Sequence, residues 1–385
     1  MNEVQLRLAV VSDSVAPWNT GGKERRNHEL LVRLAARGFT VDVYTMRWWR
    51  TPGSLERDGI TYHAICPLLP LYAGGRRSIV QALVFALASL RVVTRRFDVL
   101  EVDAIPFLQL FPMRLVAWLR RRPMVVTWHE YWGSAYWTDY LGAPGRIAAA
   151  VERLAIGLPD RIIAASYGTA ERLRAAYPRD LDIDVVPPGI PLLAADARPR
   201  EAACSVVELL SVGRLLDHKR VDVAIDACAL LRAEGLDARL TVIGEGPELH
   251  ALCARGKALG EAVRFRPFVP EHAEVLAAMG RADVLVFPSV REGFGMVALE
   301  AMAMGTPVVT SDHPDNFARH IVVDGFNGHT CAAEPSAVAA AIRSCLDRLP
   351  ELTDGARRTA EDHDWINLVD KAERAYRELP GSVPI

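Results

Sequence analysis

Short apolar runs that alternate with helical patterns constrain this chain more than any other feature of its sequence. In the first half, strands are expected at 7–12, 41–45, 99–102, 125–129 and 162–166, with a helix at 25–37. The second half repeats the pattern, with strands at 207–212, 239–243, 284–288 and 307–311 and helices at 221–235 and 296–304. Strands at this spacing with helices between them predict parallel sheets in βαβ units. Two such runs predict an α/β protein of two doubly wound, Rossmann-like domains facing each other across a cleft.

A proline-rich seam separates the two runs. The segment 187–191, Pro-Pro-Gly-Ile-Pro, halts regular structure, and small residues with weak periodicity follow it. We therefore expect domains at 1–190 and 206–363, joined by a linker at 191–205. A final helical pattern within 364–385 follows the second domain and is a candidate to pack back on the first.

The composition is that of an ordinary globular protein. Half of the 385 residues are hydrophobic, 24% are charged and the net charge is -2, which excludes a disordered or collagen-like chain. The six cysteines form no CxxC pair, so we expect neither a disulfide scaffold nor a metal site. The most apolar stretch, 79–90, is too short to span a membrane, and the N-terminus has no signal-peptide pattern. We therefore expect a cytoplasmic protein, and no nucleic-acid partner.

The near-neutral total conceals a charge asymmetry. Residues 1–190 carry 24 basic and 18 acidic residues, and the remainder carries 21 basic and 29 acidic. The net charge of +6 on the first half is typical of a protein that binds a phosphorylated substrate or an anionic membrane surface. The alternative explanation is a set of solvated surface arginines without a binding role. Five arginines frame the apolar 79–90 segment, at 76, 77, 91, 95 and 96. That segment is either an interfacial helix drawn to anionic lipid or a buried helix, and its lack of a clear polar face favours burial.

Glycine-containing turns follow several of the expected strands, at the sheet edge where α/β proteins bind ligands. Gly21-Gly22 precedes a helix whose N-terminus offers free N–H groups to an anion. Gly213-Arg214 is followed by Lys219, and two cations at this spacing suit a pyrophosphate. Because only four of the 45 basic residues are lysines, Lys219 is a distinctive choice, although it could simply begin a surface helix.

Two more turns carry acidic residues. In Gly244-Glu245-Gly246 the acid is a weak ligand candidate beside a tight turn. In the segment 292–300, two glycines free the backbone, so that N–H groups near 294–297 point at a ligand. Its acids, Glu292 and Glu300, stand roughly 8–10 Å apart by helical rise and could accept hydrogen bonds from the hydroxyls of two sugars. The alternative is a loop acid and a helix-capping glutamate.

Taken together, these motifs resemble family 4 of the retaining glycosyltransferases, which have the GT-B fold. The match rests on Glu-x7-Glu from Glu292 to Glu300 around Gly293-Phe294-Gly295, together with the glycine-arginine-lysine segment and both Gly-Gly and Gly-Glu-Gly turns. The resemblance covers nearly the whole chain. It implies a nucleotide-diphosphate sugar as donor substrate, no other cofactor, and no metal.

The resemblance also implies residue roles. Glu300 would hold the ribose, Arg214 and Lys219 the diphosphate, and Glu292 the hydroxyls of the donor sugar. The remaining donor contacts would be Gly21, Gly22, Gly213, Glu245, Gly246, Gly293, Phe294, Gly295, Met296 and Val297. His129, which follows a buried strand, matches the position that the family places beside the reaction centre.

An aromatic segment next to His129 is the candidate acceptor site. Tyr131 and Trp132 stand in a run of five aromatic residues between 128 and 137. Flat aromatic faces suit the C–H faces of sugars, and core packing is an equally good explanation for at least half of them. Ser166 is interpreted as part of the scaffold.

The predicted reaction is retaining transfer of a hexosyl group to an acceptor hydroxyl by front-face attack, with His129, Glu292, Arg214 and Lys219 at the reaction centre. The acceptor would be a small molecule, a glycan or a lipid-linked sugar, with peripheral membrane contact an open alternative. Rival functions are a sugar-nucleotide epimerase or hydrolase on the same fold, or a non-catalytic nucleotide-sugar-binding protein. An NAD-dependent oxidoreductase is disfavoured, because no complete G-x-G-x-x-G follows the first strand.

Overall fold

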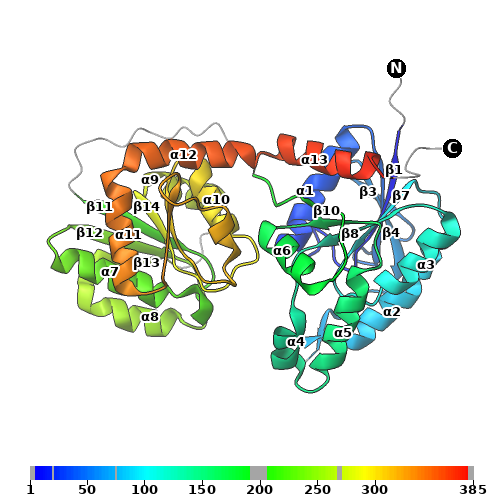
Figure 1. Ribbon diagram of the computed structural model, residues 1–385, viewed down its shortest axis with the longest axis horizontal. Helices are drawn as coiled ribbons and strands as arrows, with labels where there is room; N and C mark the ends of the chain where they lie inside the picture. The colour runs from blue at the N-terminus through cyan, green and yellow to red at the C-terminus, as the bar shows by residue number, and fades with distance from the viewer. Residues whose placement is uncertain (1–4, 20, 74–75, 191–205, 267–270, 380–385) are drawn as a thin grey trace. The chain divides into compact units, whose positions relative to one another are not determined.

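The computed structural model describes residues 5–19, 21–73, 76–190, 206–266 and 271–379. The chain divides into two compact units, coloured along the chain in Figure 1. The N-terminal unit comprises Met1–Pro187 and Trp365–Ile385, and the C-terminal unit comprises Pro188–Asp364. Each unit is built on its own parallel or mostly parallel sheet with helices on both faces, which confirms the predicted pair of doubly wound α/β domains.

An eight-stranded sheet forms the centre of the N-terminal unit. Its strands, in spatial order, are β10 (Ile183–Val185), β9 (Arg161–Ala164), β8 (Met124–Trp128), β7 (Val99–Asp103), β1 (Arg7–Val11), β2 (Thr40–Met46), β4 (Ile60–Cys66) and β3 (Leu55–Arg57). Among these strands β3 alone runs antiparallel to its neighbour. A separate hairpin pairs β5 (Tyr72–Ala73) with β6 (Arg76–Arg77). The strand order reverses between β1 and β7, so the ligand crevice of this sheet is expected beyond their carboxyl ends.

Both faces of this sheet are buried, as near-continuous apolar strands require. Leu8 and Val10 of β1 belong to a core with two helices, α1 (Gly22–Ala36) and α13 (Trp365–Arg377). Ala9 and Val11 face the opposite core. The helices of that opposite layer are α2 (Ile79–Ser89), α3 (Leu110–Arg120), α5 (Gly145–Ile156) and α6 (Tyr167–Ala176), while α4 (Gly133–Leu141) lies beside α5.

The first helix begins earlier than the sequence pattern suggested. The apolar periodicity placed its start at residue 25, whereas α1 starts at Gly22 with Gly21 as its N-cap residue. Glycine is acceptable at an N-cap, so the Gly-Gly pair begins the helix instead of forming a separate loop. Lys23 therefore stands in the first turn of α1.

The C-terminal unit contains a six-stranded, fully parallel sheet among its described residues. Its strands, in spatial order, are β13 (Val263–Arg266), β12 (Ala238–Ile243), β11 (Val207–Val212), β14 (Val284–Phe287), β15 (Val308–Ser311) and β16 (Gly328–Cys331). One face is covered by α7 (Val221–Ala233), α8 (Leu249–Gly256) and α11 (Pro335–Asp347), and the other by α9 (His272–Arg281), α10 (Met296–Ala303) and α12 (Leu349–Asp362). Here the order reverses between β11 and β14.

The last helix of the chain packs on the N-terminal sheet. Six residues of α13 and Leu379 lie in the same core as α1. A buried hydrogen-bond chain joins the helix to the sheet, because Tyr376 donates to Glu101 at 2.7 Å and Thr127 donates to the same carboxyl at 2.6 Å. Burial raises the pKa of Glu101. At the surface, Arg37, which directly follows α1, forms ion pairs with Asp370 and Glu373 of α13.

The segment at 79–90 is only half buried, which corrects the sequence-based interpretation. Phe85 and the polar Gln81 of α2 face the core, whereas Val80 and Leu87 face outward. The two polar residues of this helix, Gln81 and Ser89, are thus on its inner side, and its apolar residues are on both sides. Within the described ranges, no helix combines the length and apolar character needed to cross a bilayer.

The buried hydrogen bonds of Glu101 give a stability prediction. We expect Tyr376→Phe to lower the free energy of unfolding by about 1–3 kcal/mol, because a buried carboxyl oxygen loses its donor. The matched control is Tyr167→Phe on α6, whose side chain is 45% exposed and which should change stability by less than about 0.5 kcal/mol. Urea unfolding of both variants measures the difference, and equal midpoints would contradict the role given to Tyr376.

Candidate active site

The loops that follow β11 and β12 in the C-terminal unit lie in backbone contact. Gly213 follows β11 with a φ of +144°, where glycine is favoured. Its N–H donates to the carbonyl of Ile243 at 3.0 Å. A Cβ at Gly246 would lie 2.2 Å from the carbonyl oxygen of Leu215, and a Cβ at Gly244 would collide with Gly213. Close packing of one loop on the other therefore requires glycine at 244 and 246, whereas the positive φ favours glycine at 213.

The ammonium of Lys219 contacts a carboxylate from the next loop along the sheet edge. Lys219 ends the 3₁₀ turn η2 (Asp217–Lys219), and its Nζ donates to Oε1 of Glu292. The same Nζ lies 5.4 Å from the centroid of the Phe287 ring at the end of β14. Both charged side chains keep part of their surface exposed, 19% for Lys219 and 11% for Glu292. The structure thus brings together two of the predicted donor-site residues in a place that a ligand can reach.

Backbone hydrogen bonds hold these two loops together. The N–H of Val290 donates to the carbonyl of His218 at 2.9 Å, and Oγ of the buried Ser289 donates to the same carbonyl at 3.1 Å. Burial and the adjacent Lys219 ammonium lower the pKa of His218. His218 is therefore neutral at physiological pH, and Lys219 supplies the positive charge of this turn.

The loop after Glu292 ends in the N-terminus of α10. Gly295 has a φ of +95°, and a Cβ there would lie 2.6 Å from the Cβ of Ala318. The first N–H groups of a helix have no intrahelical acceptor, and no described residue accepts a hydrogen bond from the N–H of Met296 or Val297. Phe294 is buried in the core beneath this turn.

Glu300 lies on α10 beside a histidine that the sequence did not single out. Its Oε1 is 3.4 Å from Nε2 of His272, the first residue of α9. The side chain of Glu300 is 16% exposed. Gly293 is half-buried, whereas Arg214 and Glu245 are exposed on their loops. No ion-pair partner for Arg214 occurs in the part of the chain that the structure describes.

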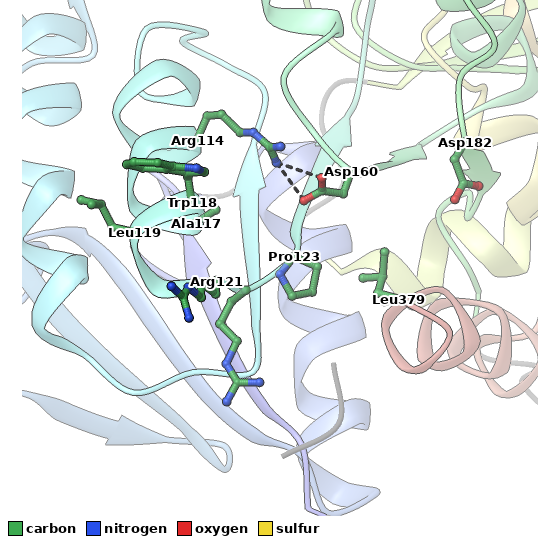
Figure 2. Close-up of a pocket in the computed structure, with 10 residues that line it drawn as sticks. Arg114, Ala117, Trp118, Leu119, Arg121, Pro123, Asp160, Asp182 and Leu379 are labelled. Atoms are coloured by element: carbon green, nitrogen blue, oxygen red, sulfur yellow. Dashed lines mark hydrogen bonds and ion pairs between the residues drawn. The ribbon is translucent and has the colours of Figure 1, made fainter. Parts of the chain in front are cut away.

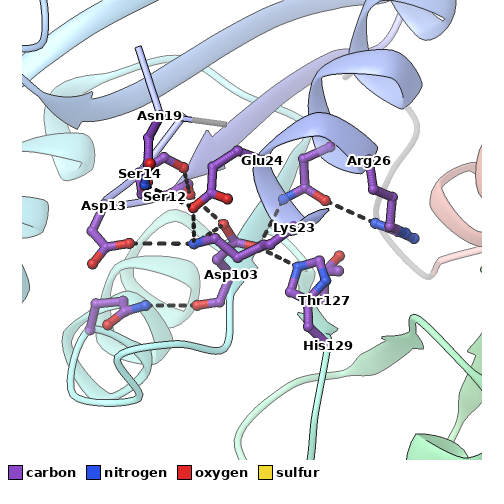
Figure 3. Close-up of polar contacts among 12 residues, drawn as sticks. Ser12, Asp13, Ser14, Asn19, Lys23, Glu24, Arg26, Asp103, Thr127 and His129 are labelled. Carbon is purple, nitrogen blue, oxygen red and sulfur yellow. Dashed lines mark hydrogen bonds and ion pairs between the residues drawn. The ribbon is translucent and has the colours of Figure 1, made fainter. Parts of the chain in front are cut away.

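The N-terminal unit gathers its own polar cluster where its strand order reverses. The carboxylate of Asp103, at the end of β7, lies at the centre of this cluster (Figure 3). It receives hydrogen bonds from Asn27 at 2.9 Å, from His129 Nε2 at 3.1 Å and from Ser12. Lys23 Nζ lies 3.2 Å from the same carboxylate. Four donors therefore surround one buried anion.

Opposite charges set the protonation states in this cluster. Burial alone would raise the pKa of Asp103, but Lys23 and the hydrogen bonds of His129 and Ser12 hold it well below the usual range. Burial alone would lower the pKa of Lys23, but Asp103 and Asp13 raise it above the usual value. Burial lowers the pKa of His129 despite the opposing effect of Asp103. At neutral pH the cluster thus contains charged Asp103, charged Lys23 and neutral His129.

A second acid, Asp13, completes the cluster on the side of α2. Its side chain is fully buried, and Oδ1 lies 3.4 Å from Lys23 Nζ. Its other oxygen, Oδ2, accepts from Arg77 and from Gln81, each at 3.2 Å. The predicted Gly21 and Gly22 stand immediately before Lys23. A Cβ at Gly22 would meet no atom within 4 Å, whereas a Cβ at Gly21 would lie 2.3 Å from Glu24.

The aromatic segment after β8 is largely a small core of its own. The Trp132 ring lies 4.6 Å from that of Tyr136 and 4.7 Å from that of Trp137. Buried Glu152 accepts hydrogen bonds from the N–H of Trp132 and from Nε1 of Trp137, both at 2.9 Å. Tyr131 and Trp132 keep partial exposure. Core packing therefore explains most of these rings.

Several residues of the two sites were missed by the sequence analysis. Asp13, Lys23 and Asp103 form the N-terminal cluster, and His272 adjoins Glu300. The scarcity of lysine was a usable signal, because two of the four lysines, Lys23 and Lys219, lie at the two switch points. Ser166 is scaffold: it is buried, and its side chain caps α6.

One acidic pair has the Asp-x-Asp spacing that can hold a cation. Asp182 and Asp184 flank Ile183 on β10. Both carboxylates face Arg161, whose Nε lies 2.8 Å from Asp182 and 3.6 Å from Asp184. Among the described residues, no group of three potential ligands of the His, Cys, Asp or Glu type is arranged to hold a metal.

Comparison with known proteins identifies the family. The family model described as "Glycosyl transferases group 1" matches residues 205–361, and the one described as "Glycosyltransferase Family 4" matches residues 20–192. The glycogen synthase of Mycobacterium tuberculosis is 31% identical to this chain, over 96% of this chain and 94% of that protein. The chain belongs to the family 4 glycosyltransferases. It is an enzyme of the transferase class, as its motifs predicted.

Other relatives of this glycosyltransferase carry different names. The D-inositol 3-phosphate glycosyltransferase of Geodermatophilus obscurus is 37% identical over 246 residues, which cover 60% of this chain and 53% of that protein. Sucrose-phosphate synthase from Thermosynechococcus elongatus has a TM-score of 0.72 at 22% identity, covering 97% of this chain and 99% of that one. Anabaena HepE, solved in complex with UDP and glucose, has a TM-score of 0.69 at 18% identity, covering 97% and 100%. These structures confirm the GT-B fold.

The N-terminal cluster of this glycosyltransferase gives a pH prediction. We expect His129 to titrate below about 6.5, its ordinary value, because burial disfavours the imidazolium. As pH falls below about 6.5, the unfolded chain takes up this proton first, so the group lowers stability in acid. Proton NMR with histidine labelled at Cε1 follows the titration, and His129→Gln assigns the signal. A midpoint above 6.5 would contradict the charge arrangement described.

Proposed function

We propose that this glycosyltransferase moves a hexosyl group from a nucleotide-diphosphate sugar to an acceptor hydroxyl, with retention at the anomeric carbon and without a metal ion. The observation that carries the proposal is the contact between Lys219 and Glu292 at the β11–β14 switch point. An ammonium and a carboxylate at one accessible place offer partners to both halves of such a donor, its diphosphate and its sugar hydroxyls.

The donor would lie along the loops of the C-terminal unit. Lys219 and the exposed Arg214 would bind the diphosphate, and the free N–H groups of Met296 and Val297 would assist them. Glu292 would accept hydrogen bonds from the donor sugar, and Glu300 from the ribose. Anabaena HepE, which shares the fold, was solved with UDP and glucose, and this supports a nucleotide-sugar donor.

The close packing of Gly244 on Gly213 and of Gly246 on Leu215 would let the nucleotide approach the backbone. Glu245 would lie at the edge of this contact. Gly21 and Gly22, at the start of α1, would contribute contacts to the phosphates, and the open space at Gly22 fits such a contact.

The N-terminal unit would bind the acceptor near its buried cluster. Because Nε2 of His129 donates to Asp103, the neutral ring presents Nδ1 as an acceptor. Nδ1 could therefore take a hydrogen bond from a sugar hydroxyl at the reaction centre. Tyr131 and Trp132, partly exposed, would line the acceptor side.

Front-face attack is the mechanism that fits this arrangement best. A covalent intermediate would need a carboxylate free to attack the anomeric carbon, but Asp103 is already surrounded by four donors and Asp13 by three. In front-face attack the bond from the anomeric carbon to the diphosphate oxygen breaks as the bond to the acceptor oxygen forms on the same face. The acceptor proton passes to the departing phosphate oxygen, and Lys219 and Arg214 stabilise the charge on the diphosphate.

The proposal also includes the class of acceptor and the cellular compartment. Relatives named for glycogen synthesis, for D-inositol 3-phosphate and for phosphatidylinositol dimannoside support a glycan, a phosphorylated polyol or a lipid-linked acceptor. We place the reaction in the cytoplasm, which suits the five described cysteines, all free thiols.

Lys219 is the residue whose loss tests donor binding most simply. We expect Lys219→Ala to lower kcat/KM by about 100-fold or more, because the charge on the leaving diphosphate loses a compact cation. Lys257→Ala is the matched control, since Lys257 is an exposed lysine of the same unit. Initial rates over a panel of nucleotide sugars measure the effect. Equal rates for both variants would refute the assignment.

The stereochemical outcome and the metal requirement can be measured on the same reaction. We expect the product to keep the anomeric configuration of the donor, seen in the proton NMR coupling of the new linkage. We also expect the rate to be unchanged by an excess of EDTA, because cationic side chains would neutralise the diphosphate. An inverted product would overturn the retaining mechanism, and loss of activity that Mg²⁺ or Mn²⁺ restores would overturn metal independence.

A further inference from the structure

Two helices of the N-terminal unit present apolar side chains to the outside. The outward residues of α2 recur at helical spacing, at Val80, Leu83, Val84 and Leu87, and those of α3 recur likewise, at Phe111, Leu115, Trp118 and Leu119. Three of them expose about two thirds of their surface or more: 68% for Val80, 69% for Leu87 and 70% for Trp118. The opposite sides of both helices, with Phe85 and Met113, are packed in the core. These exposed residues therefore lie on helices whose other sides already pack in the core.

The two outward stripes form one surface, which we name the α2–α3 face. The helices are in contact with each other, and Figure 1 shows them side by side on one flank of the N-terminal unit. Scattered single apolar residues are normal on a protein surface, whereas a contiguous apolar patch marks an interaction site. The α2–α3 face is such a patch.

Positive charge gathers at one end of this face. Helices α2 and α3 precede the parallel strands β7 and β8, so both helices end at the same edge of the sheet. The arginines that follow the helices, at 91, 95, 96, 120, 121 and 122, therefore cluster at that edge, and residues 79–96 and 104–123 contain no acid. Arg95, Arg96, Arg120 and Arg121 are exposed and have no ion-pair partner among the described residues.

An open groove of about 830 Å³ lies at the end of α3 (Figure 2). Trp118 and Arg121 line it, with Asp160 and Asp182 on the other side. Both acids are already paired, Asp160 with Arg114 at 2.8 Å and Asp182 with Arg161 at 2.8 Å. Arg121, which has no ion-pair partner among the residues described by the structure, is thus left to bind an anion beside the apolar face.

We propose that the α2–α3 face docks on the surface of a bilayer that contains anionic lipid. The apolar stripe would enter the boundary between headgroups and acyl chains, with Trp118 at the interface, where its amphipathic ring is favoured. The arginines at its end would bind lipid phosphates, each contributing attraction to an anionic surface. A bilayer fits this combination because it offers an extended apolar layer bordered by negative charge.

Docking through this face would bring the N-terminal cluster to the membrane. The helix α2 supplies Gln81 to Asp13, and Arg77, just before α2, contacts the same carboxylate. The outward Val80 follows Arg77 by three residues. A lipid-linked acceptor would therefore reach the cluster without leaving the bilayer surface, a consequence that, unlike the docking itself, rests on the proposed function.

Vesicle flotation tests the docking. The full chain is mixed with vesicles of phosphatidylcholine that contain about 30% phosphatidylglycerol, and with vesicles of phosphatidylcholine alone. We expect binding to the anionic vesicles that weakens with salt. An apolar variant, Leu87→Ser with Trp118→Ser, and a charge variant, Arg120→Glu with Arg121→Glu, should each bind at least tenfold more weakly.

The matched control is Val323→Ser with Arg264→Glu, which changes one exposed apolar residue and one exposed arginine of the C-terminal unit. It should bind like the parent chain. Circular dichroism melting checks that each variant is folded, and Trp118→Gln alone replaces the apolar variant if that one is unstable.

Three results would overturn the proposal. The first is no preference of the parent chain for anionic vesicles. The second is equal binding by the parent chain and both variants of the α2–α3 face. The third is a parent dimer in light scattering that the apolar variant converts to a monomer, with no vesicle binding, since the face would then be covered by a second copy of the chain.

Discussion

A lysine ammonium held against carboxylates at a strand-order reversal is the interaction on which both sites depend. Lys23 lies between Asp13 and Asp103 in the N-terminal unit, and Lys219 lies against Glu292 in the C-terminal unit. At such a reversal the loops on either side separate, so side chains can fill the space between them. An unpaired buried charge costs several kcal/mol, so each ammonium must keep an anion beside it.

The two lysines differ in how completely neighbouring carboxylates neutralise their charge. We infer different roles for them from this difference. Lys23 is surrounded by two carboxylates that are almost fully buried, and it fixes Asp103 as the acceptor for His129. Its cluster is therefore preorganised and has no positive charge left for a substrate. Lys219 has one carboxylate partner among the described residues, Glu292, and remains partly exposed. Under the proposed function, an arriving diphosphate would share or replace that partner, which would free the Glu292 carboxylate for the hydroxyls of the donor sugar.

The sequence predicted the architecture well because the signal was repeated along the chain. Buried parallel strands such as Val284–Phe287 are continuous apolar runs, and each begins a βαβ unit that the next one supports. The candidate residues of the C-terminal site could be predicted from local motifs, since Gly213, Lys219 and Glu292 stand in the loops that follow strands. The N-terminal cluster was missed because its acids, Asp13 and Asp103, are separated by 90 residues and carry no local motif. Only the pairing of β1 with β7 brings them together.

The outward face of α2 was misjudged for a related reason. Periodicity alone does not tell which side of a helix faces the core, and the polar Gln81 and Ser89 suggested no exposed side. The contact of Gln81 with Asp13 gives a polar residue a reason to face inward, and the apolar residues on the other side are left to the surface.

In the proposed complex, Lys219 binds the donor's diphosphate while Glu292 binds its sugar. A crystal structure of the chain soaked with UDP-glucose, and in a second experiment with GDP-mannose, tests this most directly. We expect the ammonium of Lys219 to lie within hydrogen-bond distance of a phosphate oxygen, with the Glu292 carboxylate on hydroxyls of the hexose. A donor bound elsewhere, with the Lys219–Glu292 contact unchanged, would contradict it.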